Sequence, residues 1–311
     1  MNKKTILVTG ANGQLGNTLE QLWASSQLQQ QYELVLLNRA SLDISQASDV
    51  DATLSQSNPS IIINAAAYTQ VDQAESDADK AFAVNEQGAR NLASWVRANK
   101  AGMIHVSTDF VFGGAGGSST TATPSPYLPE DKPAPSGVYG ASKLAGERAV
   151  QELLPDAGLI IRTSWLYSEH GSNFVKTMLR LMGQRDSLGV VDDQIGSPTS
   201  THSLAQLIFV IIRRISPGLE NESKLPGGVV HWSDGGAISW FEFAQAIQEQ
   251  AIAKGLLLKE IPITAITTAD YPTPARRPVY SVLDLSKTQK EFDCPRLSWQ
   301  QQLDKVLEEI R

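Results

Sequence analysis

A tyrosine and a lysine four positions apart carry the clearest chemistry in the chain. In Tyr139-Gly-Ala-Ser-Lys143 the two side chains share one face of the helix that this stretch predicts. A free tyrosine titrates near pH ~10, and a neighbouring cation favours the phenolate. The spacing therefore predicts an acid–base pair in which Lys143 lowers the pKa of Tyr139.

A threonine hydroxyl is the third candidate for this chemistry. Thr108 follows the predicted strand 103–107, so it lies at the carboxyl edge of the sheet, where ligands of open α/β sheets bind. We expect its hydroxyl to hydrogen-bond a substrate carbonyl, although a cap of the strand end would place a threonine here as well.

Three glycines between a strand and a helix form a phosphate-binding pattern. Gly10, Gly13 and Gly16 have the spacing in which the first permits the turn, the second lets a pyrophosphate approach the backbone, and the third packs helix on strand. The helix N-terminus would present free N–H groups to the phosphates. The motif predicts dinucleotide binding.

The end of the second predicted strand bears on the choice of cofactor. An acidic residue there would bind the ribose 2′-hydroxyl and repel a 2′-phosphate, but this chain has Asn38-Arg39. An amide followed by a guanidinium should tolerate the phosphate of NADP. A solvated surface charge would also account for Arg39. Asp43, slightly further on, is a candidate for the adenine side of the pocket.

The elements that must position these residues alternate between strands and helices. Short apolar runs predict strands at 6–8, 34–37, 61–63, 103–107 and 159–161, and helical patterns cover 15–23, about 72–99 with an interruption, and 139–154. This order predicts an α/β fold of the Rossmann type, a doubly wound parallel sheet covered on both faces.

The second half of the chain predicts a smaller C-terminal lobe. Helical patterns lie near 173–182 and 203–213, another opens at Ser239 with a capping-box spacing, and the last spans 299–310. We expect residues 1–165 to form the dinucleotide-binding domain, completed by about 201–232, and 166–311 to form mainly the substrate-binding lobe. Residues 113–137, rich in Gly, Pro, Ser and Thr, are expected to be a lid, a binding loop or a tolerated insertion.

Composition excludes several classes of protein. The 311 residues carry 26 Lys and Arg against 33 Asp and Glu, a net charge of −7, which argues against nucleic-acid binding. The longest apolar run, residues 207–212, is too short to span a membrane, and no signal peptide is apparent. The single cysteine, Cys294, fits a reducing compartment. We expect a cytoplasmic protein with no membrane partner.

Several motifs in order carry a family resemblance. Residues 10–16, Asn64-Ala-Ala-Ala-Tyr-Thr69, Ser107-Thr-Asp109 and Tyr139-x-x-x-Lys143 resemble the extended short-chain dehydrogenase/reductase family. The stretches 162–167, 173–179, 193–199 and 271–278 narrow the resemblance to its nucleotide-sugar reductases, from residue 4 to nearly the C-terminus.

The resemblance implies roles at named positions. Cofactor contacts fall on Gly13, Gln14 and Leu15 at the pyrophosphate, Asp43 and Ile44 near the adenine, and Ala65, Ala66, Ala67 and Thr69 along the cofactor. Tyr139 would be the acid, and Lys143 would hold the nicotinamide ribose. Sugar contacts fall on Thr108 and Asp109, with Trp165 against the methyl group, and Arg276 or Arg277 is implied at the diphosphate.

The activity implied is NAD(P)H-dependent reduction of the C4 keto group of dTDP-4-dehydro-β-L-rhamnose to dTDP-L-rhamnose. NADPH is the expected cofactor, with NADH also open because Asn38 replaces an acidic residue of some family members. The resemblance allows a homodimer and Mg²⁺, but it places no magnesium ligand. The four histidines have no ligand-like spacing, so no catalytic metal is predicted.

Two alternatives stay open. One is a reductase or epimerase of another nucleotide sugar; a dehydratase is disfavoured because Phe110 stands where a carboxylate would be needed. The other is a non-enzymatic NADP-binding subunit like the regulatory subunit of methionine adenosyltransferase. The loop 113–126 is longer than usual for the family, so its contacts cannot be transferred.

Overall fold

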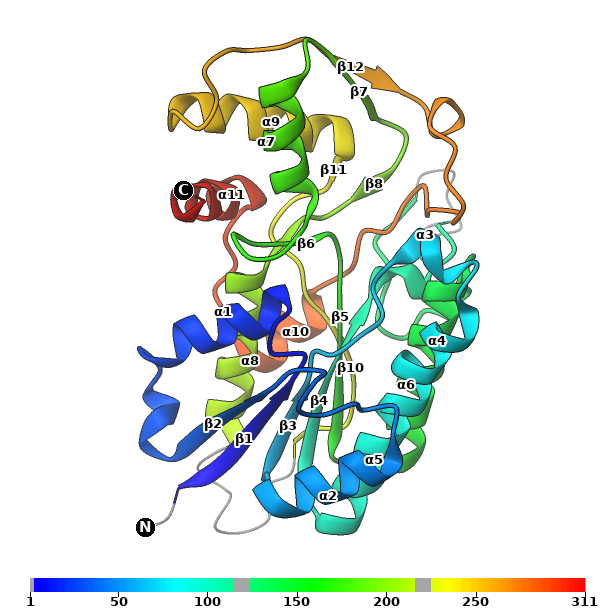
Figure 1. Cartoon of the computed structure of the whole chain (residues 1–311), viewed down its shortest axis with the longest axis vertical. Helices are drawn as coiled ribbons and strands as arrows, with labels where there is room; N and C mark the ends of the chain where they lie inside the picture. Colours follow the sequence, from blue (N-terminus) through cyan, green and yellow to red (C-terminus); the bar gives the residue numbers. More distant parts are fainter. Residues whose placement is uncertain (1–2, 115–123, 216–224, 311) are drawn as a thin grey trace.

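A single parallel sheet organises the computed structural model, which describes residues 3–114, 124–215 and 225–310 (Figure 1). Its strands are β1 (Lys4–Thr9), β2 (Tyr32–Leu37), β3 (Ile61–Asn64), β4 (Gly102–Thr108), β5 (Gly158–Thr163) and β10 (Gly228–His231). They lie in the order β10-β5-β4-β3-β1-β2. Because the chain order reverses between β1 and β3, a crevice for ligands is expected at the carboxyl ends of these two strands.

Helices cover both faces of the sheet. In Figure 1, α1 (Gln14–Trp23), α8 (Thr201–Ile215) and α10 (Ser286–Phe292) lie on one face, and α2 (Ala47–Ser57), α5 (Gly88–Asn99) and α6 (Val138–Leu153) lie on the other. The doubly wound α/β fold predicted from the sequence is confirmed.

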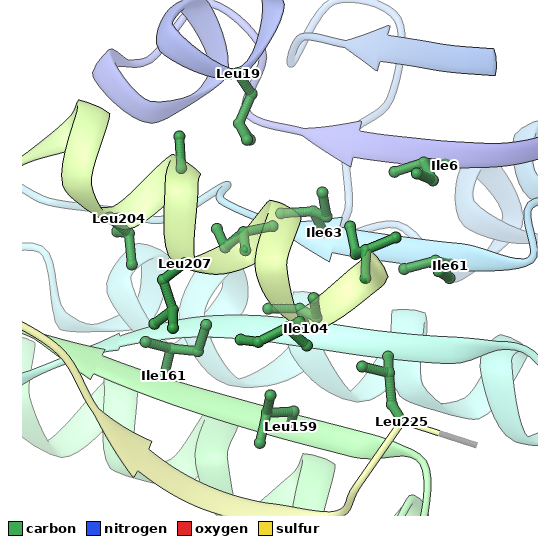
Figure 2. Close-up of a cluster of buried hydrophobic side chains, with 14 of the residues drawn as sticks. Ile6, Leu19, Ile61, Ile63, Ile104, Leu159, Ile161, Leu204, Leu207 and Leu225 are labelled. Atoms are coloured by element: carbon green, nitrogen blue, oxygen red, sulfur yellow. The ribbon is translucent and has the colours of Figure 1, made fainter. Parts of the chain in front are cut away.

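The apolar strands contribute side chains to the hydrophobic clusters on both faces of the sheet, because successive side chains of a strand point to opposite faces. Ile6, Ile61 and Ile63 pack against Leu204 and Leu207 of α8 on one face (Figure 2), whereas Leu7 and Ile62 join the cluster on the other face. These strands are buried on both sides, as short unbroken apolar runs indicate. The resulting rigid layer fixes the strand ends that carry the candidate site.

A smaller lobe sits over the carboxyl ends of the strands (Figure 1). It contains α7 (Phe174–Gln184), α9 (Trp240–Ala253) and α11 (Trp299–Glu309), with the strand pairs β6–β9 (Leu166–Tyr167, Thr199–Ser200), β7–β12 (Leu188–Val191, Ile263–Ile266) and β8–β11 (Ile195–Gly196, Ile238–Ser239). Its helices share one hydrophobic cluster around Phe243. The predicted capping box of Ser239 and Glu242 is present at the start of α9.

One local prediction differs from the structure. The sequence predicts no helix between residues 38 and 60, but α2 forms there; of its side chains only Val50 and Leu54 are buried, so its apolar stripe is weak. The interruption predicted in the helical stretch 72–99 is confirmed, because the stretch divides into α3 (Val71–Ala74), α4 (Ala78–Phe82), a π-helical turn (Ala83–Gln87) and α5. The middle of the loop 113–126, residues 115–123, lies outside the described residues.

No helix within the described ranges is long and apolar enough to cross a bilayer.

Candidate active site

The glycine turn after β1 is closed by contacts that only glycine permits. Gly10 has φ +71°, and a Cβ there would lie 2.7 Å from the Ala66 backbone nitrogen. A Cβ on Gly16 would lie 2.4 Å from the Ala11 carbonyl oxygen. These two glycines therefore join β1 to the loop after β3 and pack α1 against the turn.

Gly13 occupies a different environment from its two neighbours. Its added Cβ would meet only the Gly10 carbonyl oxygen, at 3.1 Å, so the space beside it is open. Gly13 is also the N-cap of α1, and within the described structure no side chain caps that end. Open space beside uncapped N–H groups fits the pyrophosphate of a dinucleotide. Leu15 is buried behind this turn.

Gln14 connects the glycine turn to the lobe. Its Oε1 accepts hydrogen bonds from Asn173 Nδ2 at 2.8 Å and from Ser168 Oγ at 3.1 Å. Asn173 in turn caps α7, because its side chain accepts from the Lys176 N–H. These hydrogen bonds therefore fix the position of the glycine turn, which is expected to contact the cofactor, relative to the first helix of the lobe.

The end of β2 bears the candidates for the adenosine end. The Asn38 side chain accepts from the backbone N–H groups of Ala40 and Ser41, at 2.9 and 3.2 Å, so it shapes the turn itself. Arg39 is largely exposed and lies 3.7 Å from Asp43. The hydrogen bond from Ser45 lowers the pKa of the Asp43 carboxyl, and Arg39 lowers it further. Ile44 is buried, and its carbonyl accepts from Asn91.

The loop after β3 carries the alanines. Ala65, Ala66 and Ala67 are half-buried, and Thr69 is exposed. Asn85, from the π-helical turn, holds this loop by accepting from the Tyr68 N–H at 2.8 Å and donating to the Tyr68 carbonyl at 3.1 Å. Asn85 was missed from the sequence because a buried asparagine in a helical stretch gives no periodic signal.

The catalytic candidates meet where α6 crosses β4. Lys143 is buried, and its Nζ donates to the Val106 carbonyl at 2.8 Å. Thr108, at the end of β4, donates to Asp109 Oδ1 at 3.0 Å and lies within hydrogen-bonding range of the Tyr139 hydroxyl. The Phe110 ring packs edge-on against Tyr139, with centroids 5.6 Å apart. Thr108 and Tyr139 are therefore neighbours, and Lys143, one turn further along α6, reaches the same strand.

The first turn of α6 is held by residues from other elements of the fold. Its N-cap, Gly137, has no side chain, and the Val138 N–H donates instead to Glu75 Oε1 at 2.9 Å. One turn on, Ser142 bonds the Tyr139 carbonyl and accepts from Asn85. These contacts fix the height and rotation of Tyr139.

The predicted lowering of the Tyr139 pKa is wrong for this geometry. Burial raises the pKa of Tyr139 to about 12, the hydrogen bond with Thr108 opposes the rise, and the Asp109 carboxylate adds to it. The Lys143 ammonium is instead directed at the Val106 carbonyl. Tyr139 is consequently protonated at neutral pH, the state that a proton donor requires.

Asp109 is buried beside this group. Burial raises the pKa of its carboxyl to about 6, and the neighbouring Ser281 and Thr108 hydroxyls oppose the rise. Thr108 donates to Oδ1, whereas within the described structure Asp109 Oδ2 is buried without a hydrogen-bond partner.

The Lys143 ammonium is expected to make carbonyl reduction depend on pH. Burial lowers the pKa of its ammonium to about 8, against the opposing charge of Glu147. Above that pH the ammonium becomes neutral while Tyr139 stays protonated, so the turnover number for carbonyl reduction should fall as pH rises from roughly 7 to 9.5. Cofactor affinity, measured at each pH, separates binding from turnover. A profile that is flat across this interval would contradict a need for the charged lysine.

A small cavity of about 30 Å³ lies next to the Tyr139 group. It is lined by Phe110, Trp165, Gln194, Trp240, Arg277, Pro278 and Ser281. Trp165 has φ +46° and stacks on Trp240 with centroids 3.5 Å apart, and a Cβ on Gly196 would collide with the Trp165 ring. Both indoles line the cavity, so this part of its wall is aromatic and apolar.

The structure separates the two candidate arginines. Arg277 lines the cavity and is paired with Asp72, whereas Arg276 is exposed, and its carbonyl accepts from Ser136. Sequence reasoning also missed Trp240, Gln194 and Ser281 as wall residues. They lie on segments far apart in the chain, so no local spacing connects them to Trp165.

A separate cluster could hold a metal ion. Glu169, His202 and Glu309 each place one ligand atom so that these atoms lie within 4.8 Å of one another. His202 Nε2 lies 3.2 Å from a Glu169 oxygen, and His170 Nε2 lies 3.0 Å from the same oxygen. These residues are too far apart in sequence for a ligand motif, which is why spacing gave no sign of the cluster.

Three features together define the class of the protein: a parallel sheet whose strand order reverses, an open glycine turn at the point of reversal, and Thr108, Tyr139 and Lys143 near the adjoining strand ends. These features are typical of Rossmann-type, dinucleotide-dependent oxidoreductases.

Comparison with known proteins narrows this class. Residues 4–311 match the model of the RmlD substrate binding domain family, and the chain belongs to that family. The dTDP-4-dehydrorhamnose reductase of Aggregatibacter actinomycetemcomitans is 41% identical over 301 residues, 97% of each chain. The dTDP-4-dehydrorhamnose reductase of Sinorhizobium fredii is 39% identical over 296 residues, 95% of this chain and 94% of that protein.

A solved structure extends the likeness to three dimensions. The crystal structure of dTDP-4-dehydrorhamnose reductase from Bacillus anthracis in complex with NADP has a TM-score of 0.84 to this chain. It is 36% identical and covers 99% of this chain and 100% of that one.

Proposed function

We propose that the chain catalyses the NADPH-dependent reduction of the C4 keto group of dTDP-4-dehydro-β-L-rhamnose to dTDP-L-rhamnose, the last step of dTDP-rhamnose synthesis. The observation that carries the proposal is the juxtaposition of Thr108, Tyr139 and Lys143 with the cavity walled by Trp165 and Trp240. Near-full-length identity to dTDP-4-dehydrorhamnose reductases supports it.

The residues present suit a dinucleotide. The glycine turn and the uncapped start of α1 would hold the pyrophosphate, Asn38, Arg39, Asp43 and Ile44 would bound the adenosine end, and Ala65, Ala66, Ala67 and Thr69 would line the remainder. When bound, the nicotinamide supplies the hydride.

The protein's own groups control the proton. Tyr139, kept protonated by its raised pKa, donates its phenolic proton to the oxygen that becomes an alkoxide at C4. The Thr108 hydroxyl turns from Asp109 to hydrogen-bond the same oxygen. Lys143 would hold the nicotinamide ribose, for which its ammonium would turn from the Val106 carbonyl.

The remaining groups orient the sugar nucleotide. Trp165 packs against the 6-methyl group, Asp109 lies at the sugar hydroxyls, and Arg277 contacts the diphosphate, because a planar guanidinium suits phosphate oxygens. The two binding functions fall on different parts of the chain. Residues 1–165, with about 201–232, would bind the cofactor, and residues 166–311 would mainly bind the sugar nucleotide. A homodimer and a cytoplasmic location stay predictions.

Arg39 should set the preference for NADPH over NADH. Its exposed guanidinium lies at the end of β2, where a 2′-phosphate would be bound. We expect Arg39→Ala to raise the KM for NADPH about tenfold, the loss of ~1.4 kcal/mol, while the KM for NADH changes less than about twofold. Lys259→Ala, which removes an exposed cation elsewhere, is the matched control. Equal effects on both cofactors would remove Arg39 from this role.

The proposed function is tested by following the nicotinamide absorbance of NADPH, then NADH, with enzymatically generated dTDP-4-dehydro-β-L-rhamnose. Rapid oxidation with dTDP-L-rhamnose as product is the expected result. NADP(H) binding without oxidation would instead favour a non-enzymatic NADP-binding subunit, and oxidation with a different keto sugar would favour another nucleotide-sugar reductase.

A further inference from the structure

An ion pair joins the cofactor side of the site to the sugar side. Asp72, on the short helix α3 directly after the loop 65–70, accepts from Arg277 Nη1 at 3.0 Å and from Nη2 at 2.8 Å. It also accepts from the Ala275 N–H at 3.2 Å. The two partners are separated by 205 positions in the sequence, so one carboxylate holds both the side chain and the backbone of a distant loop.

The pairing leaves a defined part of the guanidinium free. Asp72 occupies the edge formed by Nη1 and Nη2, and Nη1 also donates to Thr273 Oγ1 and to the Ala275 carbonyl. Within the described ranges no hydrogen bond from Arg277 Nε is present. The opposite edge, formed by Nε and the second Nη2 hydrogen, can therefore take a phosphate in the bidentate manner.

Arg277 sits where such a ligand would lie. It lines the cavity together with Trp165, Phe110 and Ser281, and its side chain is 27% exposed, against 40% for Asp72. An arginine with several rotatable bonds loses entropy when it is ordered by a ligand. Asp72 and Thr273 impose that order before the ligand arrives.

We propose that Asp72 is a positioning residue for the sugar nucleotide: it presents the free edge of Arg277 to the diphosphate and ties the substrate loop 271–278 to the loop that lines the cofactor. This inference rests on the proposed function, since it assigns the diphosphate to Arg277. Asp72 itself touches neither substrate nor cofactor.

The direction in which a mutation of Asp72 changes dTDP affinity distinguishes a positioning role from a purely electrostatic one. A carboxylate near a diphosphate repels it, so removal of the charge alone would tighten binding. Loss of positioning has the opposite effect. We expect Asp72→Asn, which keeps the shape of the side chain, to raise the Kd for dTDP about tenfold, measured by calorimetry with NADPH present. The Kd for NADPH should change less than about twofold, and KM for the sugar nucleotide should rise more than kcat falls.

A double-mutant cycle identifies the route of the effect. If Asp72 acts through Arg277, then Asp72→Asn should add nothing in an Arg277→Gln background, whereas independent effects would add. Asp79→Asn removes an exposed acid from the neighbouring α4 and should leave dTDP binding unchanged. Should Asp72→Asn fail to fold, Thr273→Val removes another partner of the guanidinium and should weaken dTDP binding in the same direction.

The outcomes distinguish this inference from the proposed function. Unchanged or tighter dTDP binding by Asp72→Asn, or additive effects in the cycle, would overturn the positioning role while the wild-type activity stands. A wild-type protein that binds dTDP but does not reduce the keto sugar would overturn the proposed function, and weakened binding by Asp72→Asn would still support the positioning role. Absence of dTDP binding by the wild type would overturn both.

Discussion

Replacement of Tyr139 by phenylalanine is expected to lower turnover by about 10²–10⁴, the usual contribution of a general acid, while NADPH affinity stays within about twofold. The substitution removes only the hydroxyl, and the ring keeps its edge-on contact with Phe110. Steady-state kinetics with the keto sugar, together with fluorescence titration of NADPH, measures both quantities.

Tyr167→Phe is the matched control for this variant. Tyr167 is also a buried tyrosine, and within the described structure its hydroxyl has no hydrogen-bond partner. Its loss should leave turnover unchanged. Turnover by Tyr139→Phe equal to that of the wild type would remove Tyr139 from the proton-donor role.

Replacement of Gly13 by alanine is expected to raise the Kd for NADPH about 100-fold, or ~2.7 kcal/mol, with little change in thermal stability. The reason is the uneven surroundings of the three glycines. A methyl group at Gly13 would enter open space with a single close neighbour at 3.1 Å, the Gly10 carbonyl oxygen. It would therefore compete with the cofactor pyrophosphate rather than with the fold.

Two companion substitutions make this prediction specific. Gly183→Ala, on α7 with nothing within 4 Å of the added methyl, should leave NADPH binding intact. Gly16→Ala should destabilise the protein, since its methyl would lie 2.4 Å from the Ala11 carbonyl oxygen. Wild-type NADPH affinity in Gly13→Ala would show that the pyrophosphate does not lie at this turn.

The sheet and its glycine turn were predictable because their signals are local. A strand buried on both faces is a short apolar run, and the turn at Gly10 needs a residue that tolerates positive φ. Helix α2 escaped prediction because it buries only Val50 and Leu54. Asn85, in the π-helical turn 83–87, was not predicted either, because its tertiary hydrogen bonds to Tyr68 give no periodic signal in the sequence.

The candidate site shows the same contrast between local and long-range signals. Tyr139 and Lys143 share a helix, so their spacing was informative. Other contacts join distant segments and leave no local pattern: Trp240 stacks on Trp165, Asp72 pairs with Arg277, and Glu75 accepts from the start of α6. The direction of the Tyr139 pKa was also beyond the sequence, because it depends on burial and on where the Lys143 ammonium points.

The most direct test of the central claim is the fate of the hydride. NADPH stereospecifically deuterated at the nicotinamide C4 is supplied with dTDP-4-dehydro-β-L-rhamnose, and the product is examined by NMR. The account predicts dTDP-L-rhamnose with deuterium at C4 of the sugar, one per molecule of NADPH consumed. Deuterium at another carbon, a product of the opposite C4 configuration, or an unconsumed cofactor beside a bound sugar nucleotide would contradict it.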